Sequence, residues 1–255
     1  MKTLTTFNVN GIWLDHENHK YYDRDNNQYI SVSKLIEIFS PQFEKDKISR
    51  KTAVSQLQAD GKSLSQENIK ERQSEIIASW KAKTDSAIDD GNRFHKAMED
   101  LIKTGRYTDP EWRPLCQDVF QTYLSGFYRT YAEQIVSSKK SRVAGTMDVP
   151  AIHSVKQKDL IHIRDFKTNG KGISNNENYV KWMLPPFSHL LANKYTKYAL
   201  QQSIYGAMLV ESGFRVGSIS LIWVNVHTKK HQEIFIPFMY HEAKKLLEIA
   251  KTIQL

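Results

Sequence analysis

The hydrophobic pattern of this chain changes period near residue 131, and this change limits the folds that the chain can adopt. Before it, apolar side chains recur at helical spacing, with Phe94, Met98 and Leu101 on one helix face. After it, apolar and polar residues alternate, which is typical of strands. The pattern predicts helices and strands over these ranges, in chain order: helices 86–103 and 114–129, strands 131–137, 142–152 and 159–166, helix 198–213, strands 216–226 and 232–238, and helix 241–253.

The first 85 residues differ from the rest in composition. Residues 21–31 predict a β-hairpin around a turn at 25–27, and Ser33 can cap a short helix over residues 34–39. Residues 44–86 are helical in pattern but very polar, with an interruption near Gly61, so we expect an exposed lobe or arch there. We therefore expect two domains: an N-terminal hairpin with a helical lobe over 1–85, and an α/β (α+β) core over 86–255, with a central mixed sheet flanked by helices.

Composition excludes several classes of protein. Hydrophobic residues make up 40% and charged residues 25% of the 255 residues, which is ordinary globular usage. No apolar run approaches the roughly 20 residues of a membrane helix, and residues 1–20 have neither a signal-peptide nor a transit-peptide pattern. The only cysteine is Cys116, so an internal disulfide, a cysteine-rich zinc site and a four-cysteine iron–sulfur cluster are excluded. We expect a cytosolic protein without a membrane partner.

Positive charge is concentrated in one quarter of the chain. The net charge is +8, and residues 138–200 contain eleven Lys or Arg against four acids, a local excess of +7. Such a run is often only a solvated surface, but it also suits a polyanionic partner.

Two patterns place acids and a histidine where they could act together. Gly91, His95 and Glu99 recur every four residues, so they lie along one helix face at the edge of its apolar stripe. Asp148 and Asp165 lie on strands that are expected to pair, and Lys167 shares a strand face with Asp165. Buried carboxylates repel one another, and a hard divalent cation such as Mg²⁺ or Mn²⁺ removes that cost. The alternatives are a hydrogen-bonded core histidine and a plain ion pair.

A third pattern lies on the helix that follows. Gln201 and Tyr205 are one turn apart and share a face. Taken alone, they could equally be a polar helix surface.

In this order, these patterns resemble the PD-(D/E)xK nuclease superfamily, in particular its RecB-like branch. The matching motifs are Gly91–His95–Glu99, Gly145–Asp148, Asp165–Lys167 and Gln201–Tyr205. Residues 91–99 and 165–168 look most like the mitochondrial genome maintenance exonucleases and related phage proteins. The resemblance covers about residues 80–226 and implies a restriction-endonuclease-like core.

The resemblance also implies roles for single residues. Asp148 and Asp165 would bind Mg²⁺ or Mn²⁺ together with His95 and the carbonyl of Phe166, without an iron–sulfur cluster. Lys167 would orient or help deprotonate the attacking water. Glu99 would hold His95 or a water, while Gln201 and Tyr205 would orient Lys167 or the DNA. Glu133 occupies a position where relatives often carry an acid.

The expected function is a metal-dependent DNA nuclease. We expect an exonuclease on single-stranded ends or flaps, acting in replication, recombination or repair in a bacterial or phage-infected cytosol. A catalytically silent nucleic-acid-binding module and a site-specific endonuclease are the alternatives. The expected DNA-binding residues are Arg93, Lys139, Lys140, Arg142, Lys171, Lys194 and Lys197.

Overall fold

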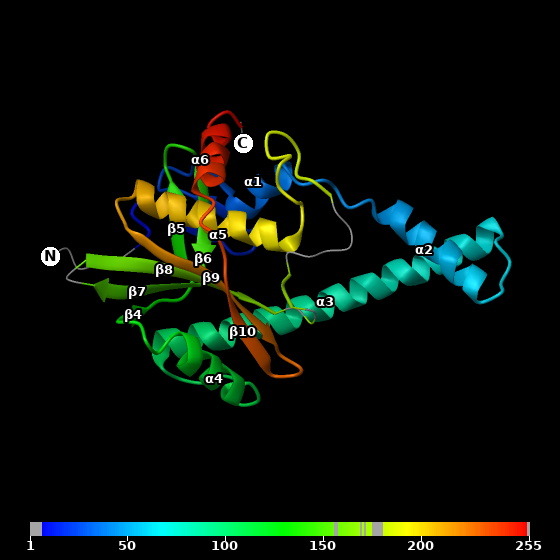
Figure 1. Ribbon diagram of the computed structural model, residues 1–255, viewed down its shortest axis with the longest axis horizontal. Helices are drawn as coiled ribbons and strands as arrows, with labels where there is room; N and C mark the ends of the chain where they lie inside the picture. The colour runs from blue at the N-terminus through cyan, green and yellow to red at the C-terminus, as the bar shows by residue number, and fades with distance from the viewer. Residues whose placement is uncertain (1–6, 156–157, 169, 171, 175–180, 254–255) are drawn as a thin grey trace. The chain divides into compact units, whose positions relative to one another are not determined.

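The computed structural model describes residues 7–253 except 156–157, 169, 171 and 175–180. Its helices are α1 (Val32–Ile38), α2 (Lys45–Ala59), α3 (Gln66–Thr104), α4 (Arg113–Tyr123), α5 (Lys194–Glu211) and α6 (Tyr240–Ala250) (Figure 1). Its strands are β1 (Trp13–Asp15), β2 (Lys20–Tyr22), β3 (Gln28–Ser31), β4 (Arg129–Thr130), β5 (Gln134–Ser138), β6 (Val143–Met147), β7 (Val149–Val155), β8 (Lys158–Lys167), β9 (Val216–Asn225) and β10 (Lys230–Phe235). Every helix in the described part of the chain is too short or too polar to cross a lipid bilayer.

The chain forms two compact units. The smaller comprises Gln42–Asn92, and the larger comprises Met1–Pro41 together with Arg93–Leu255. This division differs from the expected one at residue 85, because β3 pairs in parallel with β6 and so joins the N-terminal hairpin to the larger unit. The hairpin itself is as predicted, with β2 and β3 antiparallel.

The smaller unit is a helical pair with little core. On α2 only Ser49, Ala53 and Leu57 are buried, in keeping with the sparse apolar pattern. The ring centroids of Phe43 and Trp80 lie 6.0 Å apart. The expected boundary at residue 86 is absent, since α3 runs from Gln66 to Thr104 without a break.

The larger unit contains two mixed sheets, which confirms the expected α/β class. One has the strand order β10-β9-β8-β7-β4, and the other has the order β1-β2-β3-β6-β5. In the first, β7 and β8 are antiparallel, while β8 and β9 are parallel and are joined through α5. The order β7, β8, α5, β9 in a mixed sheet is consistent with a restriction-endonuclease-like core.

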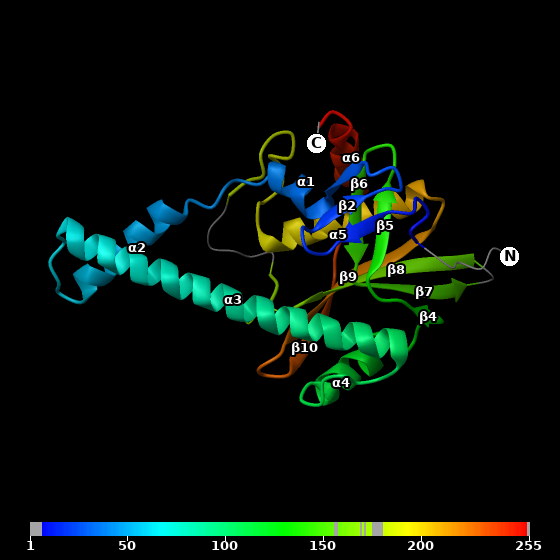
Figure 2. The ribbon, with the colours of Figure 1, turned by 180° about the vertical axis from the view of Figure 1, so that it is seen from behind.

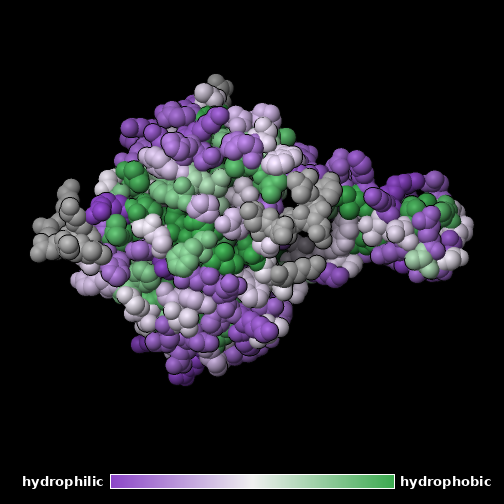
Figure 3. Space-filling view, viewed as in Figure 1, coloured by the Kyte–Doolittle hydropathy of each residue, from purple (hydrophilic) through white to green (hydrophobic). Residues whose placement is uncertain are grey.

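Helices cover both faces of the first sheet. Figures 1 and 2 show α5 and α6 on one side of it and α4 on the other. Alternation along β8 explains this, because Ile161 and Ile163 join the apolar cluster of α5 and α6, whereas Phe166 joins the cluster of α4 and the end of α3. On the face shown in Figure 3, apolar residues gather over α5 and polar residues surround α6 and α4.

One expected strand is in fact two. The sequence pattern runs without interruption from residue 142 to residue 152, but the structure divides it at Asp148 into β6 and β7. The two halves pair in different sheets: β6 with β3 and β5, β7 with β4 and β8. Asp148 therefore lies at the corner between the sheets, next to both.

Helix α5 begins earlier than its apolar pattern suggests. The side chain of Asn193 accepts a hydrogen bond from the backbone N–H of Thr196 at 2.8 Å and caps the helix. The extra turn adds Lys194 and Lys197 to the helix. They share a face with Tyr198, where the expected helix began, near the ends of β8 and α1.

A histidine on β8 links stability to pH. His162 packs on Gly217, where an added Cβ would lie 2.6 Å from the imidazole ring. Its Nδ1 accepts a hydrogen bond from the backbone N–H of Ser218 at 3.1 Å. Burial, then the charge of Arg164, lowers the pKa of His162 from 6.5 to about 4.

We expect this histidine to destabilise the fold in mild acid. Because its folded-state pKa lies below the unfolded value, the stability it contributes is complete above pH 6.5 and is lost as the pH falls towards 4. Between pH 7 and 5 the loss should be about 1 kcal/mol, because solvent screens part of the effect at this partly buried side chain. The measurement is the free energy of urea unfolding of wild type and His162→Gln at both pH values. A wild-type loss no larger than that of the variant would contradict the prediction, and His16→Gln, at an exposed position, is the control.

Candidate metal centre

Three possible metal ligands meet at the corner between the two sheets. His95 comes from α3, Glu133 from the residue before β5, and Asp148 from the junction of β6 and β7. One ligand atom of each lies within 4.8 Å of the others. His95 Nδ1 is 3.3 Å from Asp148 Oδ2. An imidazole nitrogen with two carboxylates is a donor set that divalent cations accept.

Local backbone geometry brings Glu133 into this group. Glu133 has φ +51°, an uncommon conformation for a residue other than glycine. Its backbone N–H donates to the carbonyl of Asp148 at 2.9 Å. This bond holds the start of β5 beside the end of β6, so the two acids are neighbours although fifteen positions separate them in the sequence.

The electrostatics of the group favour a cation. Burial raises the pKa of Glu133 to about 8, and the nearby charges of Asp148 and Glu99 add to the effect. A carboxyl group with such a pKa stays largely protonated at neutral pH unless a positive charge stabilises its anion. The group could therefore bind a metal ion, because its acids are crowded together at a cost that a cation would relieve.

Asp165 and Lys167 lie on the adjoining strand β8 and form an ion pair. Both face α5, whereas Phe166 between them packs on the opposite face with Phe94, as the alternation predicts. Asp165 is only 2% exposed and accepts a hydrogen bond from Gln202 Nε2 at 2.8 Å. The ammonium of Lys167 also lies 4.7 Å from the ring centroid of Tyr198.

The protonation of this pair follows from its surroundings. Burial, then the charge of Asp148, raises the pKa of Asp165 to about 6, against the opposing effect of Lys167. Burial alone would lower the pKa of Lys167, but the charges of Asp165 and Asp148 outweigh it and raise that pKa. Lys167 is thus a cation at neutral pH.

The expected ligand set and the observed group overlap without being identical. His95 and Asp148 are in the group of three, and Glu133 is its third member. Asp165 lies next to the group, engaged with Lys167 and Gln202. The backbone N–H of Phe166 donates to Asp148 Oδ2 at 2.9 Å and so ties this acid to β8. The carbonyl of Phe166 as a ligand stays a prediction.

Glu99 has partners other than His95. Its carboxylate pairs with Lys103 at 2.5 Å and with Lys96 at 3.3 Å. Burial works to raise the pKa of Glu99, but these two lysines together hold it below its ordinary value. Glu99 therefore contributes a fixed negative charge near Glu133, and a role in holding His95 remains a prediction.

Two residues of the sequence motifs, Gly145 and Tyr205, pack directly against each other. A Cβ on Gly145 would lie 2.4 Å from Cε1 of Tyr205, so only glycine lets this buried ring lie against β6. Gln201 Nε2 donates to the Tyr205 hydroxyl at 3.3 Å. The two motif residues of α5 are thus joined, and Tyr205 packs beside the corner that carries Asp148.

The sequence interpretation missed Gln202. It selected the neighbouring Gln201 and left unassigned the glutamine that holds Asp165. A signal was present, because Ala199, Gln202 and Gly206 share the face of α5 that packs on the sheet. A glutamine among such small residues, with an exposed fraction of 0%, requires a buried polar partner.

The expected DNA-binding residues fall in separate places. Lys139, Lys140 and Arg142 lie at the tip between β5 and β6. Arg142 is five residues from Met147, the end of β6 that precedes Asp148, so the two ends of this strand are on the order of 15 Å apart. Lys194 and Lys197 are on the first turn of α5, and Lys171 lies outside the described residues.

Arg93 is engaged by acids. Its guanidinium pairs with Asp109 at 2.5 Å and Glu111 at 2.7 Å. It also lies over the ring of Trp112, at 4.8 Å from the centroid. A contact between Arg93 and DNA would have to compete with these three partners, and it stays a prediction.

Comparison with known proteins gives distant structural likenesses. The sequence matches no family model and no curated protein. The fold is similar to a crystal structure from Eubacterium rectale described as a "putative exonuclease", with 12% identity and a TM-score of 0.36 over 95% of this chain and 84% of that one. It is also similar to the protein SSO0001, with 14% identity and a TM-score of 0.31 over 88% of this chain and 84% of that one. Likenesses of this size carry no argument about activity.

Proposed function

We propose that this protein is a metal-dependent DNA nuclease of the PD-(D/E)xK superfamily that hydrolyses phosphodiester bonds. The observation that carries the proposal is the joint position of His95, Glu133 and Asp148, whose ligand atoms lie within 4.8 Å of one another, beside the buried Asp165–Lys167 pair. A cation site and a buried ammonium side by side suit a substrate that carries negative charge, which a phosphodiester does.

The donor set fits Mg²⁺ or Mn²⁺. Two carboxylates with one imidazole are hard or borderline ligands, and the raised pKa of Glu133 marks a place where a positive charge is favourable. When bound, such an ion supplies Lewis-acid polarisation of a phosphoryl oxygen and lowers the pKa of water.

The protein's own residues supply positioning and charge. Lys167 is protonated, so its ammonium can donate hydrogen bonds to a phosphate oxygen and stabilise the charge that develops there. The raised pKa of Lys167 supports orientation over proton abstraction. Asp165 holds Lys167, and Gln202 holds Asp165 at 2.8 Å, so the pair is fixed before substrate arrives.

We further propose an exonuclease that acts on single-stranded ends or flaps. The test uses end-labelled linear single strands, duplexes, flaps and covalently closed circles, with and without Mg²⁺. We expect product ladders from linear strands only, and only with the metal. Cleavage of circles at fixed positions would instead assign a site-specific endonuclease. Binding without release of nucleotides under any metal would assign a silent nucleic-acid-binding module.

We expect Mn²⁺ to raise the melting temperature of the wild-type protein, and Glu133→Gln to lose most of that rise. At a hundredfold excess over its dissociation constant, a ligand adds about 2.7 kcal/mol of stability. Glutamine keeps the shape of the side chain but removes the anion that the cation needs. The measurement is thermal unfolding at increasing Mn²⁺, with Glu17→Gln as an exposed control. An equal rise in Glu133→Gln and wild type would remove Glu133 from the ligand set.

A further inference from the structure

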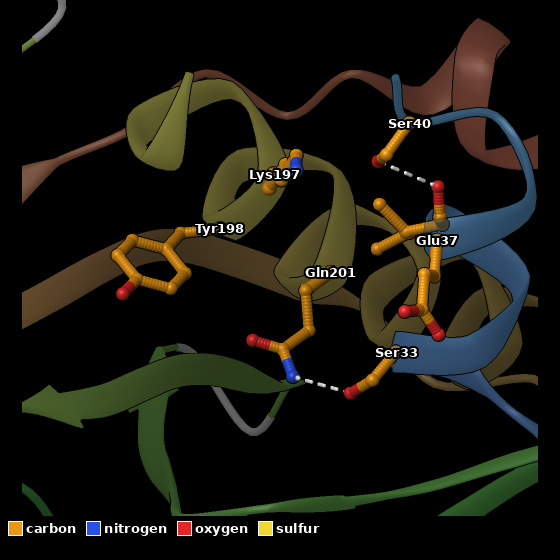
Figure 4. A pocket seen from close by; sticks show the side chains of 7 residues that line it. Ser33, Glu37, Ser40, Lys197, Tyr198 and Gln201 are labelled. Atoms are coloured by element: carbon orange, nitrogen blue, oxygen red, sulfur yellow. Dashed lines mark hydrogen bonds between the residues drawn. The ribbon is translucent and has the colours of Figure 1, made fainter. Parts of the chain in front are cut away.

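A pocket opens between α1 and the first turns of α5, beside the Asp165–Lys167 pair. Its volume is about 190 Å³. Ser33 and Glu37 of α1 and Ser40, which follows that helix, line it together with Lys197, Tyr198 and Gln201 of α5 (Figure 4). Both helices belong to the larger unit. The roles proposed for Lys167, Gln201 and Tyr205 do not require a cavity at this place.

The pocket is joined to the proposed nuclease site through two side chains. Tyr198 lines the pocket, and its ring centroid lies 4.7 Å from the ammonium of Lys167. Gln201 also lines the pocket and donates to Tyr205, which packs on β6. A group in the pocket therefore lies one side chain away from the phosphate that Lys167 would contact.

The lining selects a flat, uncharged group over an anion. Tyr198 supplies a ring and Ile36 an apolar wall, and the two charged residues of the lining, Lys197 and Glu37, have opposite signs. Pockets for drug-sized ligands occupy roughly 300–1,000 Å³, so this smaller one suits a fragment the size of a nucleobase. Bases stack on aromatic side chains, and this contact is tolerant of sequence.

The polar groups of the pocket can meet the edge of a base. Gln201 Nε2 lies 3.4 Å from Ser33 Oγ and 3.3 Å from the Tyr205 hydroxyl, both long for hydrogen bonds, so better contacts can replace them. The side chain of Glu37 is 68% exposed and makes an ion pair with Lys34 at 3.0 Å on the same helix. A carboxylate accepts hydrogen bonds from exocyclic amino groups, and a glutamine amide suits adenine.

From these contacts we propose that the pocket receives the base of a nucleotide at the end of a DNA strand, next to the scissile phosphate. Tyr198 stacks on the base, and Glu37 favours bases that carry an amino group. Glu37 is then a specificity-determining residue. The inference rests on the proposed nuclease function for the identity of its substrate, but base binding can be measured without cleavage.

The test is equilibrium binding of labelled single strands in EDTA, followed by fluorescence anisotropy. The strands are identical except for one abasic nucleotide, placed at either end or in the middle. We expect an abasic nucleotide at one end to weaken binding about tenfold, the effect of losing one stacked base, and no change from the middle position. Equal dissociation constants for intact and abasic ends overturn the inference.

Two variants separate the pocket from the rest of the surface. Ser33→Trp places a large ring in the pocket from an exposed position, and we expect it to remove the difference between intact and abasic ends. Glu37→Gln should reduce the preference for terminal adenine, cytosine or guanine over thymine. The control is Glu248→Gln, which removes a similar exposed helix ion pair, with Lys251, far along the chain. A folded Ser33→Trp protein that keeps the full difference overturns the inference.

The outcomes also distinguish the two proposals. If the protein discriminates intact from abasic ends but no metal supports cleavage, the pocket stands and the nuclease proposal fails. If the protein cleaves DNA with Mg²⁺ but binds both ends equally, the nuclease proposal stands and the pocket assignment fails.

Discussion

Replacing Lys167 with alanine should lower the single-turnover rate of DNA cleavage by about 10²–10³-fold, the usual cost of losing one donor to a developing charge. DNA affinity should change little, because one buried ammonium is a small part of a long phosphate contact. The measurement is the rate with saturating enzyme and Mg²⁺, alongside anisotropy for binding. Lys244→Ala, on α6, is a matched loss of one positive charge away from β8 and should leave the rate unchanged.

Asp165→Ala tests the other partner of the Asp165–Lys167 ion pair. It leaves Lys167 buried without its carboxylate partner, an arrangement that costs about 3–5 kcal/mol. We therefore expect both lost cleavage and a lower midpoint of urea unfolding. Lys167→Ala should also lower the midpoint, because it leaves the buried Asp165 without its partner. Cleavage at the wild-type rate by either variant would show that the pair is not part of the reaction site.

Gly145→Ala should destabilise the protein by about 1–3 kcal/mol, the usual range for overpacking a close-packed interior. The new Cβ would lie 2.4 Å from Tyr205 Cε1, and Tyr205 is only 3% exposed. Both β6 and α5 are packed on other elements of the core, which limits how far either can move. The measurement is the free energy of urea unfolding.

Two further variants make this result specific. Gly126→Ala is the control, since no atom lies within 4 Å of a Cβ at that position, and its effect should stay within about 0.5 kcal/mol. Adding Tyr205→Leu to Gly145→Ala removes the clashing ring and should recover part of the lost stability. If Gly145→Ala were as stable as wild type, the close contact between β6 and Tyr205 would be incorrect.

Periodicity predicted the elements well where one face of each is buried. The strand over 159–166 and the helix over 241–253 match β8 and α6 closely, because packing on one face imposes the repeat that the sequence displays. It failed at Asp148, where an unbroken alternating pattern crosses from one sheet to the other. Alternation records which face is buried, and it carries no information about which partner strand buries it.

The local sequence pattern by itself determined the α/β fold class of this protein and most of its candidate site residues. An α/β order, a histidine at the edge of an apolar helix face and an acid–lysine pair on one strand face are all properties of neighbours in sequence. They selected His95, Asp148, Asp165 and Lys167 as candidates, and the resemblance to the nuclease superfamily joined these residues in one proposed site.

Only the tertiary structure decided how those residues combine. It brought Glu133 next to His95 and Asp148, and it paired Asp165 with Lys167 and Gln202. It also separated the lysines of the β5–β6 tip from this candidate metal centre. The physical reason is that ligand geometry and burial depend on contacts between elements far apart in the chain. A backbone hydrogen bond from Glu133 to Asp148 leaves no periodic trace in the sequence, and the repeat of a packed helix does not show which strands it packs on.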